Sequence, residues 1–151
     1  MPLFADVSDQ LGHRHVETPF DDFAQQPLLP YRLSRLGPGI GWLDLDADGR
    51  DELIVTGDTG GRPEAFRYGP ATERFLPLAA ELPGLPGDGV AVAGWVSSAG
   101  QRRCLVGVAG QKAGDTNVPV LALFAWEEPR LTAVGDWGAG RQRGPRGGGG
   151  L

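Results

Sequence analysis

The chain contains very little cysteine, and this scarcity limits how it can be held together. Among 151 residues there is one cysteine, Cys104. A single cysteine excludes an intrachain disulfide. Cys104 opens the apolar run Cys104–Val108, with no histidine or aspartate beside it, so we expect a small buried side chain rather than a nucleophile. Stability must therefore come from packing, hydrogen bonds or a bound ion.

Long apolar runs are also missing. No stretch approaches the ~20 consecutive apolar residues of a membrane-spanning helix, so no membrane span is expected. The first residues, Met1–Asp6, have neither the basic segment nor the apolar segment of a secretory signal. If the native protein is exported, we expect its signal to lie outside this chain.

Positive charge is the minority charge, with 14 basic and 19 acidic side chains and a formal net charge of −5. This balance opposes general nucleic-acid affinity and is compatible with cation binding. Glycine and proline are abundant, at 25 and 13 residues. Together they make up about twice the usual share of ~12%, which indicates many turns and an all-β fold without long helices.

The sequence divides into four regions. We predict an irregular N-terminal lead-in over 1–38, a first β unit over 39–88, a second over 89–137 and a disordered Gly/Arg tail over 138–151. Each β unit shows four apolar segments separated by turn residues. The expected strands are Gly39–Leu43, Leu53–Val55, Glu64–Tyr68 and Phe75–Leu78, then Val90–Ala93, Cys104–Val108, Val120–Trp126 and Arg130–Val134.

The two units resemble each other when the sequence is shifted by 51 residues. Gly49 then falls on Gly100, and Leu53–Val55 falls on Cys104–Val106. Four short strands at a period near ~50 residues are typical of propeller blades. We therefore predict a partial β-propeller of about two four-stranded blades, with a β-sandwich as the structural alternative.

The strongest local pattern is an acidic loop between the first two expected strands. Carboxylates at loop positions 1, 3 and 5 can converge on one cation, and Gly49 at position 6 permits the tight curl. We predict a Ca²⁺ site whose ligands are Asp44, Asp46, Asp48, the carbonyl of Arg50, and Glu52. Three alternating aspartates repel one another unless a cation neutralises them.

The loop differs from an EF-hand. An EF-hand needs a glutamate at position 12 and flanking helices, whereas position 12 here is Val55 and the flanks are strand-like. In the second unit the 51-residue shift replaces Asp44, Asp46 and Asp48 with Trp95, Ser97 and Ala99. We expect this second blade to fold without metal.

The loop and its surroundings resemble a known family. Asp-x-Asp-x-Asp-Gly-x-x-Glu before Leu53–Val55, opened by Gly39–Trp42, resembles the FG-GAP/VCBS repeats of integrin-α-like propellers. The lead-in is similar to the start of cartilage-acidic (ASPIC/UnbV) proteins. The segments that carry this similarity are Phe4–Ser8, His13-x-His15-x-Glu17, Phe20–Phe23, Gln26–Pro30 and Leu33–Gly39.

The resemblance implies a calcium-binding propeller of about seven blades with a small C-terminal module, secreted or periplasmic, acting in extracellular binding or adhesion. A protein or carbohydrate would be the ligand, and no enzyme activity is expected. Two blades alone would leave an apolar flank exposed, so we expect further blades or self-association. The alternatives are an enzyme-associated propeller domain and a truncated, non-functional product.

Three weaker patterns complete the sequence. His13, His15 and Glu17 would share one face of a strand and could bind zinc, although an exposed polar segment is the simpler interpretation. Asp21 and Asp22 could act as paired carboxylates, although a turn anchored by the flanking phenylalanines is the preferred interpretation. We expect four aromatics to lie in the core, namely Trp42, Trp95, Phe124 and Trp126. An RNA-binding role for the Arg/Gly tail is opposed by its lack of interleaved aromatics.

Overall fold

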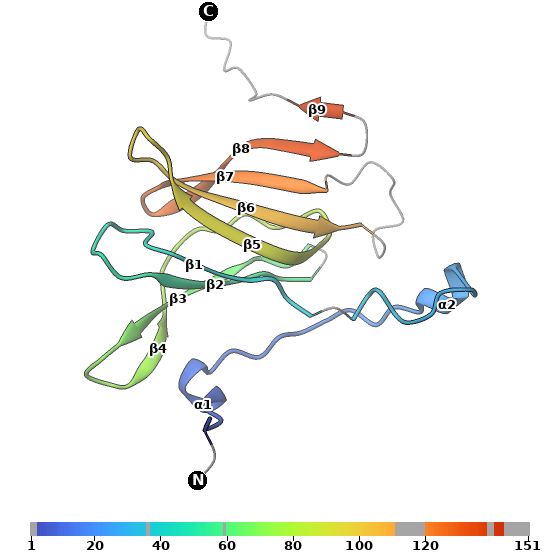
Figure 1. Ribbon diagram of the computed structural model, residues 1–151, viewed down its shortest axis with the longest axis horizontal. Coiled ribbons are helices and arrows are strands. Elements are labelled where there is room, and N and C mark those ends of the chain that lie inside the picture. Colours follow the sequence, from blue (N-terminus) through green and yellow to red (C-terminus); the bar gives the residue numbers. More distant parts are fainter. Residues whose placement is uncertain (1–2, 36, 59, 111–119, 139–140, 144–151) are drawn as a thin grey trace, which may run out of the picture.

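The protein is mostly β, as predicted from the sequence. A computed structural model describes residues 3–35, 37–58, 60–110, 120–138 and 141–143. Within these ranges nine strands form two antiparallel sheets, and the two helices are four residues long each (Figure 1). No helix in this described part is long and apolar enough to cross a membrane.

The first sheet comprises four consecutive strands in the order β1-β2-β3-β4. They are β1 (Ile40–Leu43), β2 (Glu52–Val55), β3 (Glu64–Gly69) and β4 (Arg74–Pro77). All four match strands expected from the sequence to within two residues at each end. Pro77, which lacks an N–H group for a central ladder, ends the edge strand β4, as its chemistry requires.

The second sheet has the order β5-β6-β7-β8-β9. Its strands are β5 (Asp88–Val96), β6 (Arg102–Ala109), β7 (Leu121–Glu127), β8 (Arg130–Gly138) and β9 (Arg141–Arg143). Strand β5 extends beyond the expected Val90–Ala93 because Gly94–Val96 continue to pair with β6. The expectation of disorder from 138 is wrong for Gly138, the last residue of β8, and for β9, which pairs with the backbone of β8. The other tail residues, 139–140 and 144–151, lie outside the described ranges.

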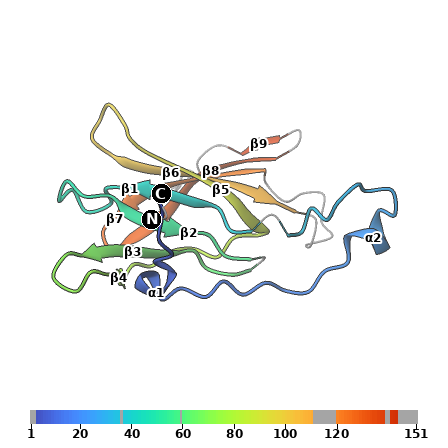
Figure 2. The same ribbon diagram turned by 60° about the horizontal axis from the view of Figure 1, so that its bottom comes forward.

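The two sheets pack face to face and enclose one main core (Figure 2). Leu43 and Ile54 of the first sheet and Cys104, Val106 and Phe124 of the second are buried in it. Leu82 and Leu85, from the segment that connects the sheets, belong to the same cluster. Cys104 is 0% exposed, so its expected burial is confirmed.

Strands β1 and β5 cross at very short range, and glycine makes this possible. A Cβ atom added at Gly41 would lie 2.5 Å from Cγ1 of Val92, and one added at Gly94 would lie 2.7 Å from Cβ of Leu43. Any larger residue would therefore push the sheets apart. The chain also joins the sheets with hydrogen bonds here, from Gly39 N–H to Gly89 O and from Gly89 N–H to Gly57 O.

Residues equivalent under the 51-residue shift face the same direction in both sheets. Leu53 points to the outer side of the first sheet, where it clusters with Val55 and Phe66, and Ile54 points into the core. In the second sheet Cys104 points into the core, and Leu105 on the opposite face is only partly buried. The face that points into the core in the first sheet therefore corresponds to the outer face of the second sheet.

The outer faces explain why two of the expected core aromatics are not buried. Trp42 pairs with Leu53 on the outer side of the first sheet and is 50% exposed, while Trp95 pairs with Arg103 and is 38% exposed. Phe124 is buried as expected, and Trp126 packs partly buried against the core.

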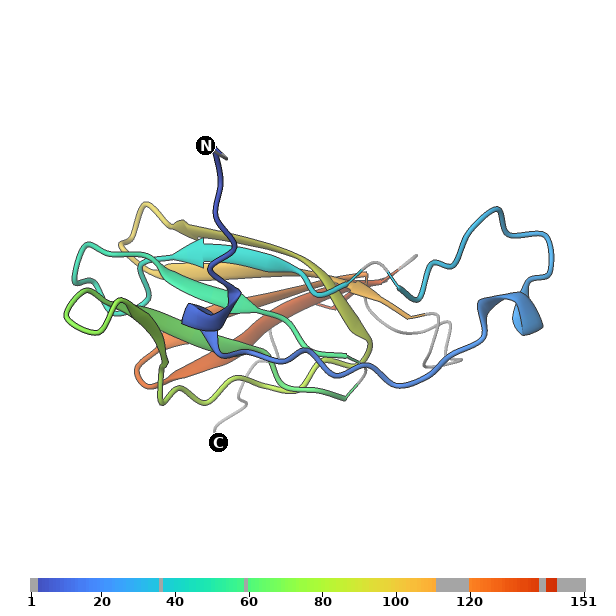
Figure 3. The same ribbon diagram turned by 90° about the horizontal axis from the view of Figure 1, so that it is seen from below.

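The lead-in contains helices α1 (Ser8–Leu11) and α2 (Asp22–Gln25) and otherwise runs as irregular chain. Helix α1 lies against β4, and Leu11 packs against the outer cluster of the first sheet (Figure 3). The loop that carries α2 projects away from both sheets. Residues from the start of the chain therefore cover part of one outer face of the stack.

Candidate metal site

The acidic loop joins β1 to β2 at one end of the first sheet. The antiparallel register pairs Leu43 with Glu52, so every residue between them belongs to the loop. Leu45 is 0% exposed and anchors the loop in the core. Ala47 and Gly49 have positive φ angles of 68° and 84°, which curl the backbone back on itself.

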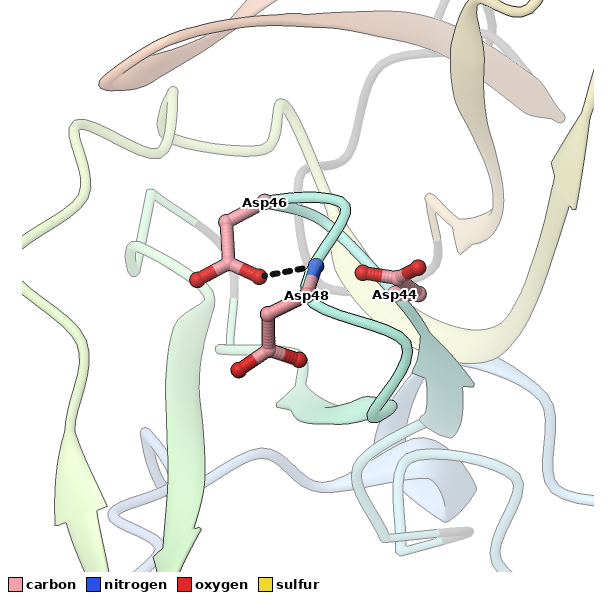
Figure 4. A group of neighbouring side chains, drawn as sticks. All are labelled: Asp44, Asp46 and Asp48. Atoms are coloured by element: carbon pink, nitrogen blue, oxygen red, sulfur yellow. Dashed lines mark hydrogen bonds between the residues drawn. The ribbon is translucent and has the colours of Figure 1, made fainter.

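This curl brings the three aspartates together. Ligand oxygens of Asp44, Asp46 and Asp48 all lie within 4.8 Å of one another (Figure 4). Main-chain N–H groups hold the carboxylates in place: Asp48 N–H donates to Asp46 Oδ1 at 3.1 Å, Gly49 N–H to Asp44 Oδ2 at 3.3 Å, and Arg50 N–H to Asp48 Oδ1 at 2.8 Å. Side chains at alternate positions therefore converge, as the sequence spacing predicted.

One oxygen of this cluster lacks a partner. Asp44 Oδ1 is buried and accepts no hydrogen bond. A buried carboxylate oxygen without a donor is costly, and a cation beside it would remove that cost. The donor set consists of carboxylate oxygens only, which hard cations such as Ca²⁺ prefer over nitrogen or sulfur. The residues present therefore fit an oxygen-coordinated divalent cation.

Glu52, the predicted ligand at the end of the loop, lies outside this three-residue cluster. Its side chain is 0% exposed. Oε2 accepts a hydrogen bond from Leu45 N–H at 2.8 Å, and Oε1 accepts one from Arg67 Nε at 3.2 Å. In this arrangement Glu52 links the start of the loop to strand β3 through hydrogen bonds. Arg50, whose carbonyl was the remaining predicted ligand, is an exposed loop residue.

Two arginines that the sequence did not point to supply positive charge around the loop. Arg67 of β3 bonds to Asp46 Oδ2 and to Glu52 Oε1. Arg102 of β6 donates from Nε to the carbonyl of Asp44 at 2.7 Å, and its Nη2 lies 3.5 Å from Asp44 Oδ2. The mutual repulsion expected of the aspartates is therefore partly relieved within the chain.

The position of Arg67 follows from strand register. Because Leu53 pairs with Phe66, the next residues along the two strands, Glu52 and Arg67, come side by side. Burial works against the charged form of Arg67, and the hydrogen bond to Glu52 together with the charge of Asp46 outweighs it, so its pKa is raised. A cross-strand acid–base pair was the signal in the sequence that could have identified this residue.

The described turn at the equivalent place in the second unit, residues 97–101, is not a comparable loop. Trp95 lies within β5. In the turn that follows, Ser97 N–H donates a hydrogen bond to the carbonyl of Gln101, and Gln101 N–H donates one to Ser97 Oγ. Of the residues that the structure describes, Asp44, Asp46 and Asp48 are the only group of three or more metal-ligating side chains that lie this close together.

The histidines of the lead-in make separate contacts with carboxylates. Side-chain burial alternates from His13 to Thr18, so His13, His15 and Glu17 do share one face of an extended segment. His13 Nδ1 lies 2.9 Å from Glu64 Oε2 of β3, whereas His15 Nε2 lies 3.3 Å from Glu17 Oε1. The three side chains are not gathered within ligand distance of one another, so the structure does not form the zinc site considered from the sequence.

Asp21 and Asp22 have different structural roles. Asp21 accepts a hydrogen bond from Phe23 N–H at 3.2 Å and caps α2. Asp22 is buried and accepts from both N–H and Oγ–H of Ser34. The hydrogen bond from the Ser34 hydroxyl lowers the pKa of Asp22. The pair therefore folds the lead-in, which agrees with the simpler of the two sequence interpretations.

No protein-family model, curated protein or solved structure matches this chain. The resemblance to FG-GAP/VCBS repeats and to cartilage-acidic proteins therefore stays a prediction, carried by the loop motif and the lead-in segments. The evidence for a site comes from the geometry of the loop itself.

Proposed function

We propose that this chain is a calcium-binding segment of a β-propeller that acts in extracellular or periplasmic binding rather than in catalysis. The observation that carries the proposal is the convergence of Asp44, Asp46 and Asp48 on a tightly curled loop between two antiparallel strands. The buried, unpartnered Asp44 Oδ1 adds to it, because a cation would satisfy that oxygen.

The arrangement of the sheets supports the propeller interpretation over a sandwich. Each sheet begins with four consecutive antiparallel strands, as a propeller blade does, whereas immunoglobulin-type sandwiches use Greek-key connections. Equivalent residues such as Ile54 and Leu105 face the same direction, as expected for repeated blades related by rotation about an axis. Two sheets of a sandwich would instead turn equivalent apolar faces toward each other.

The proposed role of the cation is structural. The loop connects β1 to β2, and its residues contact both sheets through Arg67 and Arg102. A divalent ion held by the three aspartates would fix this end of the first sheet and favour the folded state by mass action. The binding function itself would belong to exposed surfaces of the assembled propeller, with a protein or carbohydrate as the ligand.

Calorimetric titration with CaCl₂, together with thermal unfolding in calcium and in chelator, tests the proposal. We expect one strong site per chain and a melting temperature that rises with calcium. Asp46→Ala should abolish most of that response. Asp51→Asn is the matched control, because Asp51 is an exposed acid of the same loop outside the cluster, and it should keep the response. A wild-type chain whose melting temperature ignores calcium would refute the proposal.

A further inference from the structure

Arg67 of the first sheet contacts two acidic residues, Asp46 in the loop and Glu52 at the start of β2. It contacts Asp46 Oδ2 and Glu52 Oε1 from the neighbouring strand β3. We propose that Arg67 is a built-in counter-ion that competes with a divalent cation for the loop and thereby sets its calcium affinity. This inference rests on the calcium site put forward under Proposed function.

Counting the carboxylate oxygens shows why the two would compete. Asp46 Oδ1 already accepts the N–H of Asp48, and Glu52 Oε2 already accepts the N–H of Leu45. The remaining oxygen of each carboxylate is the one that contacts Arg67. A cation that draws on those two oxygens would share them with the guanidinium of Arg67.

The charges lead to the same conclusion. A guanidinium and a divalent cation that share one carboxylate lie only a few ångströms apart, where like charges repel strongly at the reduced dielectric of a partly buried site. The Arg67 side chain is 39% exposed, so water lies beside it and the arginine can swing outward. Glu52, at 0% exposure, cannot leave in the same way, so the arginine is the mobile partner.

Arg102 provides a natural comparison within the same chain. It carries the same charge and also contacts the loop, but its short hydrogen bond goes to the carbonyl of Asp44. Its contact with the Asp44 carboxylate is longer, at 3.5 Å, and the second oxygen, Asp44 Oδ1, has no partner. Removing Arg102 therefore takes a positive charge and its contacts with Asp44 away from the loop, without freeing Asp46 or Glu52.

The experiment compares CaCl₂ affinities of the wild type, Arg67→Met and Arg102→Met by calorimetric titration. Methionine keeps much of the arginine volume without the charge. We expect Arg67→Met to bind calcium roughly tenfold more tightly than the wild type, the size expected for one released charged hydrogen bond, and Arg102→Met to show a clearly smaller gain. Without calcium, Arg67→Met should melt below the wild type, since its carboxylates then lack a counter-ion.

The outcomes separate this inference from the calcium proposal. Equal affinities for the wild type and Arg67→Met would overturn the inference and leave the calcium site standing. Binding by Arg67→Met with none by the wild type would show that Arg67 blocks the loop, and it would overturn the proposal that the native chain binds calcium. Absence of binding to either protein would overturn both proposals.

A second measurement uses only the wild-type protein, so it does not depend on whether a variant folds. The Arg67 Nε–H resonance of the wild-type protein can be followed by NMR during the CaCl₂ titration. Competition predicts that this resonance shifts and loses protection from solvent exchange in proportion to calcium bound, while the Arg102 Nε–H resonance retains its protection. An Arg67 resonance that stays protected at saturating calcium would contradict the inference.

Discussion

Arg102 Nε lies 2.7 Å from the main-chain carbonyl oxygen of Asp44, so a strand of the second sheet holds the first residue of the acidic loop in the first sheet. This contact links the loop to the packing of the sheets. Arg102 therefore has two roles: it donates to the carbonyl of Asp44 and partly balances the charge of the Asp44 carboxylate.

Replacement of Arg102 by methionine should lower the free energy of unfolding by about 1–2 kcal/mol in the absence of calcium, since a hydrogen bond from a charged group is lost. Chemical denaturation measures this change. Arg130→Met removes an exposed arginine from the start of β8 and should change stability by less than about 0.5 kcal/mol. Equal effects of the two substitutions would show that the link to Asp44 contributes nothing to stability.

Thr56 is a buried polar junction between the sheets. Its hydroxyl accepts the N–H of Gly39 at 2.7 Å and donates to the carbonyl of Gly89 at 2.5 Å, and the residue is 1% exposed. Thr56→Val keeps the shape but leaves both main-chain groups without this partner, so we expect a loss of about 1–3 kcal/mol in unfolding free energy. Thr56→Ser keeps the hydroxyl and should lose less, and the reverse order would contradict this account.

Asp22 should make the lead-in sensitive to acid. Its pKa is lowered in the folded protein by the hydrogen bond from Ser34, from an ordinary value of 3.8. A lowered folded pKa means that the carboxylate stabilises the fold above its unfolded pKa and that this contribution disappears as pH falls through the folded pKa.

The test compares wild type with Asp22→Asn across pH 7 to 2. The wild type should be the more stable at neutral pH. The difference should start to shrink as the pH falls below about 4 and should be gone only below the lowered pKa of folded Asp22, where both side chains are uncharged. Because other acids titrate in the same range, the difference between the two proteins is the quantity to follow. A difference that stays constant with pH would rule out this role of Asp22.

Cys104 offers a chemical probe of the contact between the sheets. It is 0% exposed, and burial raises its pKa to about 11. At pH 8 only about one thiol in a thousand would be ionised, so a disulfide reagent should react far more slowly than with a free cysteine.

The rate of this reaction should therefore report how often the sheets separate. Under the calcium proposal, saturating calcium should slow the labelling of the wild type and leave the labelling of Asp46→Ala unchanged. The appearance of the reagent's product by absorbance gives the rate. Rapid labelling of the folded protein would show that the core around Cys104 opens readily.

Strand positions could be predicted because the local pattern and the tertiary environment agree. Apolar segments bounded by glycine and proline became β1 to β8, and the loop spacing alone brought Asp44, Asp46 and Asp48 together. Both results depend on neighbours in the sequence, where turn chemistry and side-chain alternation act directly.

Features that depend on pairing between distant residues were missed. Arg67 reaches the loop through the register of β2 with β3, and Arg102 reaches it through the packing of one sheet on the other. The shift of 51 residues also misplaced Trp95, because the turn of the second unit is shorter than the acidic loop and β5 extends to Val96. The exposure of Trp42 depended on which face of the sheet it occupies, and sequence hydrophobicity alone does not determine that.

Because equivalent residues face the same way in both sheets, the two ends of the stack present different faces. At one end α1 and Leu11 of the lead-in cover part of the Leu53 face. At the other end the face of Leu105 is apolar, as the core is. Trp95 and Leu121 on this face are 38% and 37% exposed. A further sheet of the same pattern that packed on this second end would present an equivalent face outward again, so the arrangement of the two sheets can repeat from there.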